Sequence, residues 1–518
     1  MFTLDVNTFF GTLPGQRTDY RLGTLLDLME QHGIATALTL SLRGVHDDHV
    51  AGNAETLAAC RANPRLIPVA TINPLRGLGL EADLEQIKAG GFRAVRLYAG
   101  EAFQDVSPDS LSFQRVLQGL APLRLPIIAS ATVKRHIAAL ARATADLGLP
   151  LLFVETSYDA QAEVEEAARR YPQVFVDTAR LATPGAIEVL ADAVGYDRIL
   201  YGSGMPRYAP QASMNVIFQA DLSDEQRAQI LAGNALRLFG LDQATMPPQH
   251  EAAKFRGYTG PKIDVHAHLH ADNYRFPIAA AGADVALDQC RRYNIEVMIA
   301  SSAPGIFYDM EAGNRELKTI IDAHPQFRGY VVTNPNLLEE SCAEMDTYYR
   351  FDNFVGAKIH CEYSHQPTAG PKMRALFAEI ARRGRPVKIH NDGPGWAEAI
   401  RDLAQAHPQL AIIIAHGGPP GTGRIVADVP NVYLEFCSSA PIRGVIQDAL
   451  KAIGPERLLF GTDQDLLHPG FVLGTYYDAG LTPEQEQMIM YTNARRLFGF
   501  GQARDSARAH APLSVRGH

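Results

Sequence analysis

Short apolar runs alternate with longer amphipathic stretches along almost the whole chain. The runs are continuous and rich in Val, Ile and Leu, which is typical of parallel strands buried on both faces. The stretches between them, such as 372–384 and 396–407, have the apolar spacing of helices, and two late ones begin with capping signals, Ser-x-x-Gln at 223–226 and Thr-x-x-Gln at 482–485. The predicted strands lie at 3–7, 34–40, 66–72, 93–98, 126–130, 150–155, 174–178 and 198–203 in the first half, and at 263–268, 295–300, 328–333, 355–360, 386–390, 411–416, 431–436 and 458–463 in the second.

The second half repeats the first at a nearly constant offset of about 260 residues. Asn-Ala-x-Arg-Leu-Phe-Gly occurs at 234–240 and again at 493–499, and Asn-Pro occurs at 73–74 and again at 334–335. Eight strand–helix units per half match the size of a (β/α)8 barrel. The pattern therefore predicts an α/β protein made of two tandem (β/α)8 TIM barrels. A Rossmann-type sheet is the alternative, but no G-x-G-x-x-G follows a strand.

Domain boundaries follow from this repeat. Residues 1–243 are expected to form the first barrel and 261–501 the second. Between them, 244–260 is polar and broken by Pro and Gly, as expected of a linker. Residues 502–518 lack periodicity and are expected to form a flexible tail.

Composition narrows the classes of function. At 518 residues, 46% apolar and 20% charged, the chain is too long for one core and has an ordinary soluble composition. A net charge of −9 argues against a general nucleic-acid binder, and no Lys/Arg block suggests a membrane patch. Neither a signal peptide nor an apolar run of membrane-spanning length is found, and five scattered cysteines are typical of reduced thiols. We expect a cytoplasmic protein with a small-molecule substrate and no nucleic-acid or membrane partner; a homo-oligomer is left open.

Candidate metal ligands follow strands of the second half. Residues i and i+2 of a strand point to the same side, so His266 and His268 project together into the barrel mouth. His390 ends the fifth strand and Asp463 the eighth, which neighbours the first in a closed barrel. Three neutral imidazoles and one carboxylate suit one Zn2+, with Mn2+ as an alternative, and leave space for a water whose pKa would fall to roughly 7.

Other polar residues end neighbouring strands. His416 is either a further ligand or a residue that orients water, and we favour the second role. Lys358 and His360 share one side of the fourth strand and are candidates for binding substrate. Lys358 could also be carboxylated and bridge two metals, or be satisfied by buried carboxylates such as Glu435. Asp465, beside Asp463, is expected to lie on the solvated surface.

Four segments resemble motifs of the amidohydrolase superfamily, namely Asp-Val-His-Ala-His at 264–268, Ala-His-Gly at 415–417, Phe-Gly-Thr-Asp at 460–463 and the repeat at 493–499. The resemblance is to its amidohydrolase-related branch, which includes aminocarboxymuconate-semialdehyde decarboxylase, resorcylate-type decarboxylases and several lactonases. It covers nearly the whole chain, twice, and suggests a tandem duplication.

This resemblance assigns roles to the candidate residues. It implies that His266, His268, His390 and Asp463 bind the metal, with His416 positioning or activating water. The first half departs from the pattern at each of these points, where it has Asn7, Phe9, Ser130, Glu155 and Gly204.

The first barrel is therefore expected to lack a metal. Phe and Gly offer no ligand atom, and one carboxylate with a hydroxyl cannot replace the set. This barrel is expected to stabilise the second or to lend a loop to its mouth. A metal-independent site of its own, using Arg96, Tyr98 and Glu155, is the remaining alternative.

The leading functional prediction is metal-dependent hydrolysis of an amide, a lactone or another cyclic ester, with Asp463 transferring the proton. Non-oxidative decarboxylation of an aromatic or unsaturated acid at the same site is the alternative within enzymes. A non-catalytic sensor or scaffold is the alternative from another class.

Overall fold

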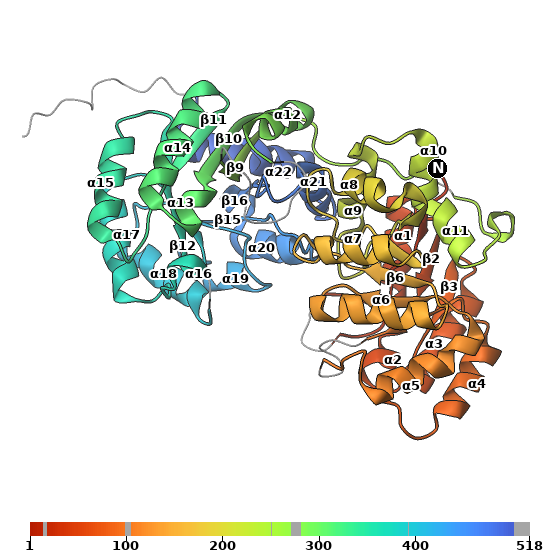
Figure 1. Cartoon of the computed structure of the whole chain (residues 1–518). Helices are drawn as coiled ribbons and strands as arrows, with labels where there is room; N and C mark the ends of the chain where they lie inside the picture. Colours follow the sequence, from red (N-terminus) through yellow and green to blue (C-terminus); the bar gives the residue numbers. More distant parts are fainter. Residues whose placement is uncertain (14–17, 99–104, 250, 271–280, 392, 502–518) are drawn as a thin grey trace, which may run out of the picture.

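The chain forms two closed barrels of parallel strands. The computed structural model describes residues 1–518 apart from 14–17, 99–104, 250, 271–280, 392 and 502–518 (Figure 1). Each barrel contains one eight-stranded sheet with its strands in sequence order. The predicted fold, two tandem (β/α)8 TIM barrels, is confirmed. The predicted tail, 502–518, lies outside the described residues.

All sixteen predicted strands are present, with shifts of a few residues at their ends. The first barrel contains β1 (Leu4–Asp5), β2 (Thr36–Thr39), β3 (Leu66–Thr71), β4 (Ala94–Leu97), β5 (Ile127–Ser130), β6 (Leu151–Val154), β7 (Val174–Asp177) and β8 (Ile199–Leu200). The second contains β9 (Lys262–Leu269), β10 (Ile295–Ser302), β11 (Phe327–Val332), β12 (Phe354–His360), β13 (Val387–His390), β14 (Ile412–Ile414), β15 (Val432–Glu435) and β16 (Leu458–Leu459).

Helices surround each barrel. Those of the first barrel are α1 (Leu22–His32), α2 (Arg43–His46), α3 (His49–Ala62), α4 (Leu80–Gly90), α5 (Leu111–Leu120), α6 (Ile137–Asp146), α7 (Gln161–Arg170), α8 (Ala186–Val194), α9 (Pro210–Gln219), α10 (Asp224–Ala228) and α11 (Asn234–Leu238). Those of the second are α12 (Ala283–Tyr293), α13 (Ala303–Phe307), α14 (Met310–Ala323), α15 (Leu338–Tyr348), α16 (Cys361–Ser364), α17 (Pro371–Arg383), α18 (Trp396–Ala406), α19 (Thr422–Ile425), α20 (Val445–Ile453), α21 (Pro469–Tyr477), α22 (Pro483–Gln487) and α23 (Asn493–Phe498).

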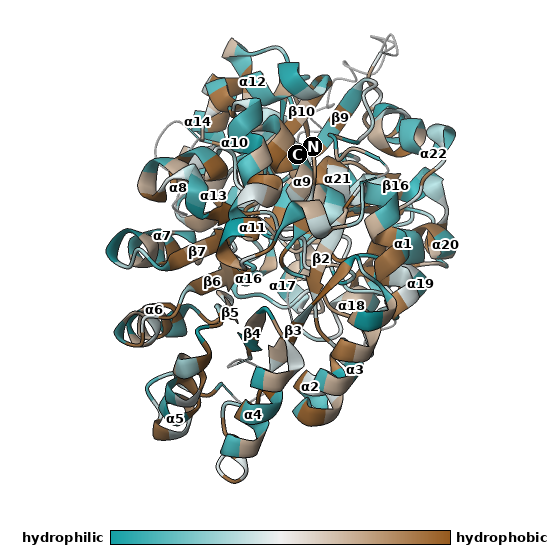
Figure 2. Cartoon of the chain, turned by 90° about the vertical axis from the view of Figure 1, so that its right-hand side faces the viewer, coloured by the Kyte–Doolittle hydropathy of each residue, from teal (hydrophilic) through white to brown (hydrophobic). Residues whose placement is uncertain are grey.

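Both barrels close in the same way. The amide of Val6 donates to the carbonyl of Tyr201 at 3.0 Å, and the amide of Val265 donates to that of Phe460 at 3.0 Å. The strands are buried on both faces, and the helices turn their polar residues outward (Figure 2). This burial explains why the strands are continuously apolar. The predicted capping boxes are confirmed at the starts of α10 and α22.

The two barrels pack against each other through α9 and α21, which lie between them (Figure 1). Gly474 of α21 approaches α9 so closely that an added Cβ would lie 2.6 Å from the backbone of Ala212. Nδ2 of Asn215 donates to the carbonyl of Gly470 at 2.9 Å, and Nε2 of His32 lies 2.7 Å from Oδ1 of Asp478. A contact this close, with buried polar bonds, fixes one relative placement of the barrels.

The segment predicted as a linker is packed along the first barrel. The carbonyl of Lys254 accepts from Nε2 of Gln211 at 2.8 Å, and that of Arg256 accepts from Nδ2 of Asn215 at 2.8 Å. Ala253, which precedes them, is buried. Among the described residues, no helix has the length and apolarity needed to cross a bilayer.

Candidate metal centre

Three predicted ligands meet at the mouth of the second barrel. His266 and His268 extend from β9, and Asp463 follows β16, which pairs with β9 through the barrel closure. Oδ1 of Asp463 lies 3.1 Å from Nε2 of His268 and 3.4 Å from Nε2 of His266. One ligand atom from each residue lies within 4.8 Å of the other two, and all three side chains are buried.

Each imidazole is held by its other nitrogen. Nδ1 of His266 lies 2.5 Å from Oε1 of Glu435, and Nδ1 of His268 lies 3.1 Å from Oγ of Ser301. Since a carboxylate can only accept, Nδ1 of His266 carries the proton and its Nε2 offers a lone pair. Orientation of this kind is typical of metal-binding histidines.

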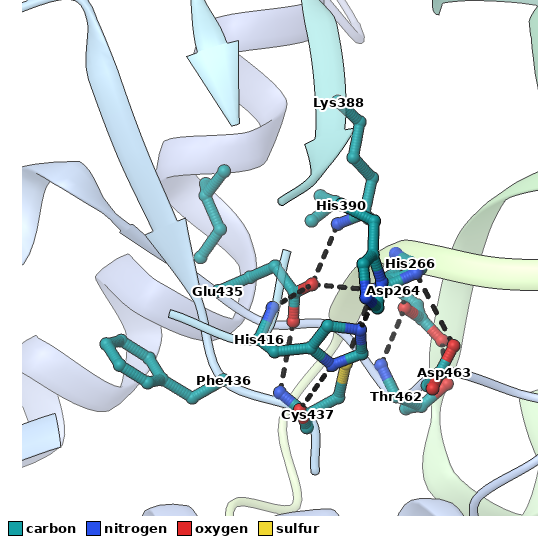
Figure 3. Close-up of polar contacts among 12 residues, drawn as sticks. Asp264, His266, Lys388, His390, His416, Glu435, Phe436, Cys437, Thr462 and Asp463 are labelled. Carbon is teal, nitrogen blue, oxygen red and sulfur yellow. Dashed lines mark hydrogen bonds and ion pairs between the residues drawn. The ribbon is translucent and has the colours of Figure 1, made fainter. Parts of the chain in front are cut away.

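Glu435 is the centre of a buried polar network (Figure 3). Its Oε1 accepts from Nζ of Lys388 at 2.9 Å and from the amide of His416 at 3.1 Å, and its Oε2 accepts from the amide of Cys437 at 3.1 Å. Burial acts to raise the pKa of Glu435, but Lys388, His416 and the hydrogen bond from Cys437 together outweigh it, and the pKa is lowered. A stable carboxylate therefore anchors both His266 and the turn that carries His416.

Asp463 is aimed into the mouth by an unusual backbone. Its φ is 62°, in the left-handed region that residues with a Cβ rarely adopt, and φ of His416 is 61°. The preceding Thr462 bonds to the buried carboxylate of Asp264 through its amide, at 3.1 Å, and through its hydroxyl. These bonds stabilise the strained turn at a functional position.

His390 and His416 form a second pair beside the three ligands. Nδ1 of His416 lies 2.8 Å from the carbonyl of Cys437, so it is the donor and Nε2 carries the lone pair. That Nε2 accepts from Nδ1 of His390 at 3.1 Å. His390 thus contacts His416 and, among the described residues, is not in the close group of His266, His268 and Asp463. Its role as a fourth ligand stays a prediction.

Lys358 and His360 separate in space despite their shared strand. Nζ of Lys358 lies 3.2 Å from Nε2 of His266, whereas the ring of His360 stacks on that of His390 at a centroid distance of 3.9 Å. Burial, with help from Lys388, lowers the pKa of Lys358 to about 7. Their predicted contact with substrate stays a prediction.

A cavity of about 270 Å3 opens above the centre. The described residues that line it include His360 but not Lys358. Its walls come from loops after several strands and from one residue of the first barrel, with the following lining residues: Tyr158, His268, Ile306, Phe307, His360, Glu362, Tyr363, His390, His416, Ser438, Ser439, Asp463, Leu466 and Leu467.

The electrostatics keep the histidines neutral and the aspartate charged. Burial lowers the pKa of His266 and His268, and it lowers that of His390 to about 2. Burial alone would raise the pKa of Asp463, but His266 and the hydrogen bond from His268 bring it well below its usual value. Neutral imidazoles beside an ionised carboxylate are the protonation states that a metal requires.

The donor set fits a divalent cation. The lone pair on Nε2 of His266 faces the carboxylate of Asp463, and two electron-rich groups 3.4 Å apart repel each other unless a cation separates them. Lys358 donates to this Nε2, but with a pKa of about 7 its proton is easily replaced. His266, His268 and Asp463 are therefore suited to hold one ion.

The matching region of the first barrel is filled by its own side chains. Arg96 is buried and donates to Oδ1 of Asn7 at 2.6 Å and to Oε1 of Glu155 at 3.2 Å. Glu155 keeps the left-handed backbone of its counterpart His416, with φ of 63°. At Gly204, an added Cβ would lie 2.5 Å from the ring of Tyr208. The ion pair between Arg96 and Glu155 thus occupies the region of the first barrel that corresponds to the candidate metal ligands of the second.

Sequence reasoning missed three features. The expectation that Asp465 is solvated is wrong: it is fully buried, 3.2 Å from Nε2 of His270. Glu435 was considered as a partner for Lys358, whereas its hydrogen-bonded lysine is Lys388. Tyr158 lies too far away in sequence for any motif to connect it with the site, but Lys388 occurs two residues before His390 and its i, i+2 spacing was a usable signal.

Comparison with known proteins identifies a family whose model matches both barrels. The amidohydrolase family model matches residues 16–241 and, separately, 263–500. No curated protein matches the chain. Similar solved structures include the 2,6-dihydroxybenzoate decarboxylase of Rhizobium, 17% identical with a TM-score of 0.38 over 46% of this chain and 99% of its own.

Two further structures are similar to the same extent. A dihydroxybenzoic acid decarboxylase from a Polaromonas species, solved with bound manganese, is 18% identical with a TM-score of 0.38, covering 47% of this chain and 98% of its own. A Pseudomonas putida protein assigned as a 2-pyrone-4,6-dicarboxylic acid hydrolase is 21% identical with a TM-score of 0.38 and the same coverage, 47% and 98%. These likenesses are too low to indicate a reaction. Through the family match over both barrels, this chain belongs to the amidohydrolase family, whose members are metal-dependent enzymes.

Proposed function

We propose that the second barrel hydrolyses an amide, a lactone or another cyclic ester of a small molecule, with one divalent metal ion. The observation that carries this proposal is the convergence of His266, His268 and Asp463, the last two of which line a cavity that His416 also lines. Nitrogen ligands with one carboxylate favour Zn2+, with Mn2+ as the alternative. When bound, the ion would supply Lewis acidity and make a water molecule acidic enough to react near neutral pH.

The chain's own residues would orient and move protons. Glu435 fixes the ring of His266, and the carbonyl of Cys437 fixes the ring of His416. With its Nδ1 donating, His416 has one lone pair on Nε2, which accepts from Nδ1 of His390 in the structure. It would orient water once this hydrogen bond is exchanged for one from the water. Asp463 remains ionised, so its carboxylate can accept a proton from water and pass it to the leaving group.

The cavity suits a flat molecule of one ring. Its volume of about 270 Å3 corresponds to roughly nine water molecules. The rings of Phe307 and Tyr363 meet edge to face at 4.5 Å, and His360 also contacts Tyr363 at 4.5 Å. Such walls favour a planar substrate.

Decarboxylation of an aromatic or unsaturated acid is the second candidate. The aromatic walls favour it. Lys358 is not among the lining residues, but its Nζ lies 3.2 Å from Nε2 of His266, and its pKa of about 7 would let it both hold and release a proton near neutrality. The two reactions give different products. Hydrolysis in 18O-labelled water puts the label into the product, whereas decarboxylation releases CO2.

The test is a turnover screen of metal-loaded protein against lactones, amides and aromatic acids. Hydrolysis predicts turnover with 18O incorporation, and activity of the Asp463→Asn variant lower by on the order of 100-fold or more. The matched control is Asp402→Asn, on the exposed face of α18, which should retain activity. Near-normal turnover by Asp463→Asn removes the proposed proton transfer, and a loaded protein inert on the whole panel favours a sensor or scaffold.

The first barrel is proposed to be a metal-free support. Its Arg96–Glu155 ion pair and the ring of Tyr208 support this role over a separate catalytic site. The left-handed backbone shared by Glu155 and His416 supports the proposal that the chain arose by tandem duplication.

A further inference from the structure

The cavity above the candidate metal centre is formed by both barrels. Tyr158 lies between β6 and α7 of the first barrel, and it lines the cavity together with His268, His390 and Asp463 of the second. Among the described lining residues, it alone comes from the first barrel. The second barrel's site is therefore incomplete without its neighbour.

We propose that Tyr158 contacts the substrate and helps to select it. Its phenol hydroxyl donates a hydrogen bond to an oxygen of a single-ring carboxylic acid, or of a cyclic ester derived from one, whose reacting group faces Asp463. This inference rests on the proposed function and deepens it, because it names a ligand class and a specificity-determining residue.

The turn that carries Tyr158 is held in place on both sides. The amide of Ala160 donates to the carbonyl of Ser157 at 2.9 Å, which closes the turn around the tyrosine. The carboxylate of Asp159 accepts from the hydroxyl of Ser157 and from Nζ of Lys134, the latter at 2.9 Å. These bonds preorganise Tyr158, so that little ordering remains to be done when a ligand binds.

The loop that follows β7 in the first barrel is hydrogen-bonded to the second barrel beside the cavity. Nε of Arg180 donates to the carbonyl of Ser439 at 3.0 Å, and the amide of His468 donates to the carbonyl of Ala182 at 2.7 Å. Ser439 itself lines the cavity. Arg180 therefore links the loop after β7 to the wall of the cavity.

The chemistry of Tyr158 suits an oxygen acceptor. Burial, followed by the charges of Asp159 and Asp463, raises the pKa of its phenol to about 12. The hydroxyl therefore keeps its proton at neutral pH and can donate to a carboxylate or carbonyl oxygen without taking up charge. Its amphipathic ring also suits the aromatic wall formed by Phe307 and Tyr363.

Binding of simple ring acids tests the inference. Benzoate, salicylate and isophthalate are titrated calorimetrically into Zn2+-loaded wild-type protein, Tyr158→Phe and Tyr158→Ala. We expect the wild type to bind at least one of them. Tyr158→Phe should bind it roughly 10-fold more weakly, because one hydrogen bond to a charged group is lost. Tyr158→Ala should be weaker still, and the metal content of both should equal that of the wild type.

The control is Tyr171→Phe, a partly buried tyrosine at the end of α7, which should bind like the wild type. Wild-type affinity in both Tyr158 variants overturns the inference, as does failure of the wild type to bind any of the three acids. The proposed function would fail on a different result. In that case the protein binds these acids in a Tyr158-dependent way but turns over none of the lactones, amides and aromatic acids of the activity screen. With a turned-over substrate, we expect Tyr158→Phe to raise KM more than it lowers kcat.

Discussion

Nδ1 of His266 lies 2.5 Å from Oε1 of Glu435. His266 lies on β9 and Glu435 ends β15, two strands away around the barrel. This contact sets which nitrogen of His266 is offered to a metal, and it does so through a carboxylate that is itself fully buried. The candidate metal centre would thus depend on a residue outside the group of His266, His268 and Asp463.

We therefore predict that Glu435→Gln lowers metal affinity by roughly 10- to 100-fold. The amide can still accept, but it does not stabilise the protonated Nδ1 as a carboxylate does. A competitive chelator titration measures the change. Because Lys388 would lose its charged partner, the double variant Glu435→Gln/Lys388→Met separates loss of metal from loss of folding.

The matched control is Glu398→Gln, on the exposed face of α18. It should bind metal like the wild type. Unchanged affinity in folded Glu435→Gln would show that the orientation of His266 does not depend on this carboxylate.

The arrangement of strands could be predicted from the sequence because two-sided burial leaves continuous apolar runs, and the i, i+2 spacing of His266 and His268 gave their common side. The left-handed turns at His416 and Asp463 could not be predicted, since residues with a Cβ rarely adopt that conformation, even though Asp and His adopt it more often than most. Asp465 was misjudged because a carboxylate beside a site gives no sign of a buried partner such as His270.

The sequence predicts that the first barrel stabilises the second or lends a loop to its mouth, but it does not predict which residue reaches the cavity. Tyr158 reaches the cavity through the packing of one barrel on the other, which includes the contact of α9 with α21, and tertiary contacts between repeats leave no local pattern. Residue types were enough to predict the chemistry of each barrel mouth. They did not predict which loops of the two barrels come into contact.

The ion pair of the first barrel gives a stability prediction. Arg96→Met leaves Glu155 buried without its partner and should lower the free energy of unfolding by roughly 3 to 5 kcal/mol. The double variant Arg96→Met/Glu155→Gln should recover much of this loss. Differential scanning calorimetry measures both, with Arg115→Met as control because its pair with Glu81 is exposed.

An Arg96→Met variant as stable as its Arg115→Met control would contradict a supporting role for this pair. The metal content of the folded Arg96→Met protein should stay at the wild-type level, since the ligands lie in the other barrel.

A buried acid in the first barrel predicts a pH dependence. Burial raises the pKa of Asp5 from 3.8 to about 7 in the folded chain. Between these values the folded chain holds a proton that the unfolded chain has lost, so stability falls as pH rises through this window. The full effect of this one group is on the order of 4 kcal/mol.

Asp5→Asn should therefore show a smaller fall in melting temperature between pH 4 and pH 7 than the wild type, as expected from the linkage above. Asp27→Asn, exposed on α1, serves as the control and should follow the wild type. Parallel curves for Asp5→Asn and the wild type would show that Asp5 does not titrate in this range.

The most direct test of the central claim is the metal content of the purified protein by elemental mass spectrometry, before and after loading with Zn2+ or Mn2+. We predict one ion per chain in the wild type, and loss of that ion in the His266→Ala/His268→Ala variant. We also predict that the ion is retained in Asn7→Ala, the matching position of the first barrel. A wild type that takes up no ion, or a His266→Ala/His268→Ala variant that keeps it, would contradict the account.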